Sequence, residues 1–97
     1  MTSEAAEASV VISHAVGLHA RPSVKLTKLA KSFEAAIHLR GGENGDWIDA
    51  KSIVRVMALK LGEGATLSFK ASGPDADDAL SALVGLVERN FDEPQHG

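Results

Sequence analysis

The stretch Gly17-Leu18-His19-Ala20-Arg21-Pro22 leads directly into residues 23–33, where apolar side chains recur at helical spacing. Proline is tolerated in the first turn of a helix but not in its interior, so this helix is predicted to begin at His19 or Ala20. The first amides of a helix have no internal hydrogen-bond partner, and the helix dipole is positive at that end. The sequence therefore predicts a site beside His19 that favours an anion.

Short β-rich or alternating segments predict four strands, at residues 10–13, 36–40, 47–49 and 65–71. Asn44-Gly45 predicts a hairpin turn between the second and third strands. Two more helices are predicted, one over residues 52–60 and a last one that starts at Gly73-Pro74-Asp75 and is stopped by Pro94. The buried stripe of the last helix is predicted to comprise Leu80, Leu83, Val84, Val87 and Phe91. The order β-α-β-β-α-β-α predicts an α+β open-faced sandwich, a four-stranded antiparallel or mixed sheet covered on one face by helices.

The length of 97 residues predicts one domain, with 44% hydrophobic and 24% charged residues as in ordinary globular proteins. We expect a disordered extension at residues 1–9, a single domain at 10–92 and a frayed tail at 93–97. The first nine residues have no apolar core like that of a signal peptide, and no apolar run is long enough to cross a membrane. A cytoplasmic protein is expected.

The absence of cysteine excludes disulfides, thiolate metal sites and thiol nucleophiles, and no cofactor or metal site is expected. The net charge of −3 argues against a protein that coats nucleic acid. This average hides a cluster of basic residues around two segments, comprising Arg21, Lys25, Lys28, Lys31, Lys51 and Arg55. A basic face on an acidic protein indicates an acidic partner or a phosphate.

Three motifs together resemble the HPr family, the histidine-containing phosphocarriers of the bacterial phosphoenolpyruvate-dependent phosphotransferase system. They are the stretch at residues 17–22, Ala50-Lys51-Ser52-Ile53 at the start of a short helix, and Gly73-Pro74 before the last helix. The resemblance spans roughly residues 10–91. It implies a monomeric carrier rather than an enzyme: Enzyme I would phosphorylate Nδ1 of His19, and Enzyme IIA domains would then take the phosphoryl group.

The chemistry of the residues agrees with that role. A neutral imidazole is a nucleophile near neutral pH, and a helix N-terminus disfavours its protonated form. The amides of Ala20 and Arg21 and the guanidinium of Arg21 are placed to hold phosphate oxygens. From position alone, the better interpretation of His19 is a helix-capping or surface histidine, and the simplest interpretation of Arg21 is a solvated first-turn charge. That charge is unfavourable against the helix dipole, which itself suggests a visiting anion.

Ser52 matches the regulatory serine of the family, which an ATP-dependent HPr kinase/phosphorylase modifies in many bacteria. The simpler interpretation of Ser52 is a helix N-cap, and both interpretations are compatible.

A partner-docking patch is expected from exposed apolar residues with a basic rim. The apolar residues are Leu18, Ala20, Ile53, Val54 and Met57, and the rim comprises Lys28, Lys51 and Arg55. The alternative is that several of the apolar residues are core, Met57 and Val56 above all. Small patches of this kind suit brief, salt-sensitive encounters.

The remaining features concern packing or pathway. His14, His38 and His96 are expected at the surface, and Trp47 is expected to pack beside the hairpin. Lys60 stands where many relatives have glycine, and a left-handed lysine there costs on the order of 1 kcal/mol. Residues 33–40 and 90–93 resemble the nitrogen-related paralogue NPr, so a regulatory relay without sugar transport stays an alternative.

Two other classes of protein are alternatives to the phosphocarrier. An ACT-like module that binds a small molecule would not depend on His19. An RNA-binding sheet would need aromatic side chains on its strands, and the sequence has no tyrosine and a single tryptophan.

Overall fold

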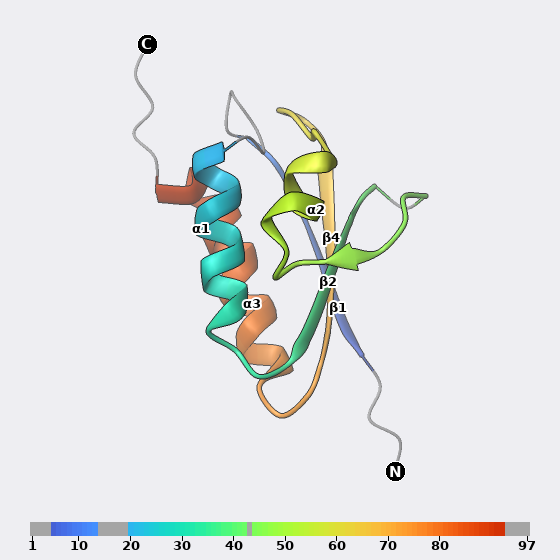
Figure 1. Ribbon diagram of the computed structural model, residues 1–97, viewed down its shortest axis with the longest axis vertical. Helices are drawn as coiled ribbons and strands as arrows, with labels where there is room; N and C mark the ends of the chain where they lie inside the picture. The colour runs from blue at the N-terminus through green and yellow to red at the C-terminus, as the bar shows by residue number, and fades with distance from the viewer. Residues whose placement is uncertain (1–4, 14–19, 43, 93–97) are drawn as a thin grey trace.

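The computed structural model describes residues 5–13, 20–42 and 44–92. In chain order the elements are β1 (Ala6–Val11), α1 (Ala20–Lys31), β2 (Ala36–Gly41), β3 (Ile48–Asp49), α2 (Ile53–Ala58), β4 (Thr66–Ser72), α3 (Ala76–Glu88) and a short turn of 3₁₀ helix, η1 (Asn90–Asp92). All three α-helices lie on one side of the sheet (Figure 1). The predicted α+β open-faced sandwich is confirmed.

The sheet has the strand order β1-β4-β2-β3, and every neighbouring pair is antiparallel. β4 lies in the middle, so Phe69 pairs with Ala8 of β1 on one side and with Leu39 of β2 on the other. The last strand of the chain therefore lies between the first two, which joins the N-terminal and C-terminal halves in one sheet.

The two faces of the sheet differ as the alternation predicts. Leu67, Phe69 and Ala71 of β4 are buried under the helices. On the opposite face, the charged groups of Arg40 and Lys70 lie over the ring of Trp47, at 4.4 and 4.6 Å from its centroid. Trp47 thus packs beside the hairpin, as predicted, and shields two cations on the solvent side of the sheet.

β1 corrects one prediction. The strand begins at Ala6 rather than at residue 10, so residues 6–9 form most of an edge strand instead of part of a disordered extension. Alanine and glutamate are poor strand formers, which concealed this segment in the sequence. Hydrogen bonds to β4 stabilise the strand conformation that the local sequence does not favour. The strand ends at Val11, so Ile12 and Ser13, which were predicted to belong to it, follow it instead.

The helices start largely as predicted but end early. α1 begins at Ala20, with Pro22 in its first turn. α2 ends at Ala58 rather than residue 60, because Lys60 adopts a left-handed backbone with φ of 53°. α3 ends at Glu88, well before Pro94, because Asn90, Phe91 and Asp92, which follow the C-cap residue Arg89, are also left-handed. Phe91 is buried as predicted, although it lies in η1 and not on the helix.

Asp75 directly precedes α3, but its carboxylate makes no side-chain cap bond to that helix. It accepts hydrogen bonds from the amides of Glu34 and Ala35 instead, at 2.9 and 2.8 Å. The Glu34 amide is the main cause that lowers the pKa of Asp75, with smaller contributions from Ala35 and from the charge of Lys51. Asp75 therefore ties the start of α3 to the connection between α1 and β2.

Gly73 permits that close approach. Its φ is 140°, and a Cβ at this position would lie 2.8 Å from Cα of Ala35. Any side chain here would push the two connections apart.

No helix in the described part of the chain is long and apolar enough to span a membrane.

Candidate functional site

The described part of the predicted site begins at the first turn of α1. His19 and Leu18 lie outside the described residues, and Ala20 is the first residue of the helix. The first turn contains no acidic residue and carries the exposed cation Arg21. The helix dipole and the guanidinium both give this helix end, which follows His19 in the sequence, a positive potential.

Packing fixes which side of α1 faces outward. Pro22 and Ser23 are buried in the first turn, and Leu26 and Ala30 continue the buried stripe. The hydroxyl of Ser23 is enclosed and has no hydrogen-bond partner among the described residues. Because Pro22 and Ser23 point inward, Ala20, Arg21 and Val24 are left exposed.

A shallow groove of about 340 Å³ runs along this exposed side of α1, lined by Ala20, Arg21, Val24, Lys25 and Lys28. Val24 is 43% exposed although it is apolar. The groove thus combines an apolar centre with cations. The sequence did not predict that Val24 is exposed, because helical periodicity alone does not show how wide the buried stripe is.

α2 supplies a second exposed apolar surface. Val54 is 75% exposed and Met57 39%, whereas Val56 is fully buried. Val56 is therefore core, as expected, but Met57 faces outward more than a core residue does. α2 contacts α1, and its last turn lies toward the end of the molecule where α1 begins (Figure 1).

The predicted basic rim divides into two groups. Lys28 and Arg55 are exposed. Lys51 is half-buried, and its ammonium group donates to the carbonyl of Phe33 at 2.9 Å. Lys51 thus contributes an internal tie between the start of α2 and the end of α1, in addition to its charge.

Ser52 is the N-cap of α2, as predicted. It has extended backbone angles, and its Oγ accepts a hydrogen bond from the amide of Arg55 at 3.3 Å.

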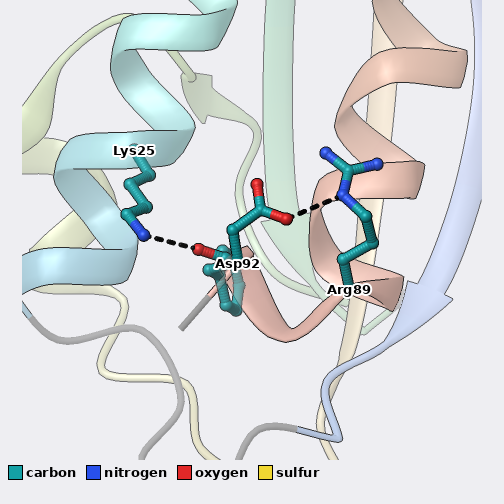
Figure 2. A network of polar contacts seen from close by, with 4 residues as sticks. Lys25, Arg89 and Asp92 are labelled. Carbon is teal, nitrogen blue, oxygen red and sulfur yellow. Dashed lines mark hydrogen bonds and ion pairs between the residues drawn. The ribbon is translucent and has the colours of Figure 1, made fainter. Parts of the chain in front are cut away.

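The sequence reading also missed the contacts of η1. Lys25 of α1 donates to the carbonyl of Phe91 at 2.9 Å, and Arg89 bonds Asp92 at 2.9 Å. Figure 2 shows Lys25 and Arg89 reaching this turn from opposite sides of Asp92. Ser13 Oγ donates to Oδ1 of Asn90, also at 2.9 Å. The one available signal was Asn90, since asparagine tolerates left-handed backbone better than most residues.

Comparison with known proteins agrees with this geometry. The family model described as "PTS HPr component phosphorylation site" matches residues 6–89. The chain belongs to the HPr family. Its members are phosphocarriers of the phosphotransferase system, and this function holds for the present chain.

HPr relatives match nearly the whole chain. The phosphocarrier protein HPr of Cupriavidus necator is 43% identical over 82 residues, which is 84% of this chain and 90% of that protein. Phosphocarrier protein NPr of Escherichia coli is 35% identical over 85 residues, covering 88% and 93%. The crystal structure of HPr-C-His from Thermoanaerobacter tengcongensis has a TM-score of 0.84 at 32% identity, covering 93% of this chain and 99% of that one.

Proposed function

We propose that this HPr-type protein carries the phosphoryl group on Nδ1 of His19, taking it from phospho-Enzyme I and giving it to an Enzyme IIA domain. The observation that supports this most is the start of α1 at Ala20, in a first turn with no acidic residue and with Arg21 exposed. This helix end follows His19 directly in the sequence.

The transfer requires little machinery. The lone pair on Nδ1 of a neutral imidazole attacks phosphorus, while the bond from phosphorus to Enzyme I breaks and its electron pair returns to Enzyme I. The proton on Nε2 need not move. Phosphoryl transfer depends chiefly on positioning and on neutralising the phosphoryl oxygens. The amides of Ala20 and Arg21 and the Arg21 guanidinium fit the second requirement.

The same site then has to dock two partners in turn. Val24 in the α1 groove and Val54 and Met57 on α2 offer exposed apolar area, and Lys28 and Arg55 offer charge. With Ala20 and Ile53, they form a surface suited to partners with an acidic rim. A surface this small supports rapid release, which a carrier needs.

Ser52 is proposed as a second, regulatory phosphorylation site for an HPr kinase/phosphorylase that uses ATP. Ser52 is half-buried, and its hydroxyl caps α2 beside the exposed Val54. A phosphate here would add about 1.5 to 2 negative charges next to the proposed docking surface. Incubation with ATP and HPr kinase should yield an acid-stable phosphate, and its persistence in Ser52→Ala would reject this assignment.

The pathway has two versions, since relatives named HPr and relatives named NPr both match most of the chain. A sugar-uptake carrier should discharge onto sugar-specific Enzyme IIA domains. A nitrogen-related carrier should discharge onto the nitrogen-related Enzyme IIA protein. Parallel discharge rates onto the two classes distinguish these versions.

The relay itself is tested in two steps. Radiolabelled phosphoenolpyruvate and Enzyme I should label the protein, and the isolated labelled protein should then lose its label to Enzyme IIA without further phosphoenolpyruvate. His19→Ala should take no label. His38→Ala is the matched control, because His38 lies on the opposite face of the sheet, and it should behave as wild type. Absence of label on wild type, or label on His19→Ala, would overturn the proposal.

A further inference from the structure

η1 holds the residues on both sides of the segment that contains His19. Ser13 is the last described residue before segment 14–19, and its Oγ donates to Oδ1 of Asn90 at 2.9 Å. Lys25, in the second turn of α1 after that segment, donates through Nζ to the carbonyl of Phe91, also at 2.9 Å. Two consecutive residues near the C-terminus thus anchor chain positions 77 and 66 residues earlier.

The backbone of η1 is left-handed at three consecutive residues, which is uncommon outside glycine. Asn90, Phe91 and Asp92 have φ of 56°, 58° and 57°. Asparagine tolerates this conformation, but phenylalanine does not adopt it readily. Its cost is offset because the Phe91 ring is fully buried, while the Phe91 carbonyl is left to receive Lys25. Strain of this kind persists only where surrounding contacts maintain it, and it concentrates near functional sites.

Arg89 and Asp92 close the turn from the outside. Their side chains are 58% and 53% exposed and joined at 2.9 Å. An ion pair this exposed contributes little to stability. Figure 2 shows the pair beside the Lys25 contact, so the ion pair and the anchor belong to one network.

We propose that η1 is a positioning element for phosphoryl transfer, in which Asn90 is the positioning residue that holds Ser13 at the same turn that Lys25 of α1 contacts. The inference rests on the proposed function of His19. Transfer to a nucleophile held in the wrong place is slow even when the partner binds normally, because reaction requires near-ideal alignment. Asn90 should therefore affect the rate of transfer more than it affects docking or folding.

Asn90→Gly is the sharpest variant. Glycine adopts a positive φ without strain, so the backbone turn is retained while the Oδ1 acceptor is removed. We expect its kcat for phosphorylation by phospho-Enzyme I to fall about tenfold with an unchanged KM. Asn90→Asp keeps an oxygen acceptor for Ser13 and should restore the rate. Unfolding by urea, followed through the fluorescence of the single tryptophan, should show nearly equal stability for all three proteins.

Ser13→Ala removes the other half of the same hydrogen bond and should give the same loss. The double variant Ser13→Ala/Asn90→Gly should be no slower than either single variant, since all three lack one interaction. Ser9→Ala is the matched control, because it removes a serine–serine hydrogen bond of 3.1 Å to Ser68 in the sheet, and it should retain the wild-type kcat.

Three results would overturn the inference: a wild-type kcat in Asn90→Gly, an equal loss in Ser9→Ala, or a loss that Asn90→Asp does not restore. If wild type takes no phosphoryl group from Enzyme I, the proposed function fails and this inference fails with it. Phosphorylation of the wild-type protein alone thus distinguishes the two failures.

Discussion

Lys60 shows how one residue ends a helix at a measurable cost. Its φ of 53° places it in the left-handed region, where a Cβ crowds the backbone. Lys60→Gly is expected to raise the free energy of unfolding by about 1 kcal/mol, measured by urea unfolding. Lys60→Ala removes the side chain but keeps the Cβ, so it should leave stability nearly unchanged. Equal stability of the two variants would show that backbone strain is not the cause.

The lowered pKa of Asp75 predicts how the stability of the protein depends on pH. Its pKa is lowered in the folded protein, chiefly by the hydrogen bond from the Glu34 amide. A lowered folded pKa means that the contribution is complete above the unfolded value of about 3.9 and is lost as pH falls through the folded pKa. Wild type should therefore exceed Asp75→Asn in stability near neutral pH, and the difference should shrink as the pH falls through the lowered pKa of Asp75.

Asp77→Asn controls for loss of charge in that experiment, because Asp77 is exposed in the first turn of the same helix. Chemical unfolding at a series of pH values measures all three proteins. A difference between wild type and Asp75→Asn that stays constant down to the most acidic pH would contradict the assignment.

At the scale of elements, substitutions of Ser52 measure how much its N-cap stabilises α2. Ser52→Ala should lower the free energy of unfolding by about 1 kcal/mol, because α2 loses the acceptor for the Arg55 amide. Ser52→Asp keeps a capping oxygen and should keep wild-type stability. Thermal unfolding of the three proteins measures the cap alone. A Ser52→Ala variant as stable as wild type would contradict a stabilising role for this cap.

Elements with strong local signals were predictable from the sequence. α1 followed from Pro22 and the spacing of Leu26 and Ala30, and the N-cap of α2 from Ser52. β1 was misplaced because its strand conformation depends on pairing with β4, some sixty residues away in the chain. η1 was missed because burial of Phe91 overrides the ordinary preference of that residue. Contacts distant in sequence decided both of these elements.

For the molecule as a whole, the local charge on α1 and α2 is opposite in sign to the net charge of the chain. The net charge is −3, yet Arg21, Lys28 and Arg55 are exposed on α1 and α2. We expect the second-order rate of phosphorylation by Enzyme I to fall as ionic strength rises, because salt screens such encounters. Lys28→Gln should reduce that rate and its salt dependence, whereas Lys70→Gln, on the opposite face, should change neither. Stopped-flow or quench measurements across salt concentrations check this, and equal effects of the two variants would contradict it.

The proposed phosphoryl transfer requires that the phosphate is attached to His19. The most direct measurement is to phosphorylate the protein with phosphoenolpyruvate and Enzyme I, digest it under alkaline conditions that preserve phosphohistidine, and locate the phosphate by mass spectrometry. We predict one acid-labile, base-stable phosphate per chain, on the peptide that contains His19. A phosphate on any other residue, or one still formed by His19→Ala, would contradict the account.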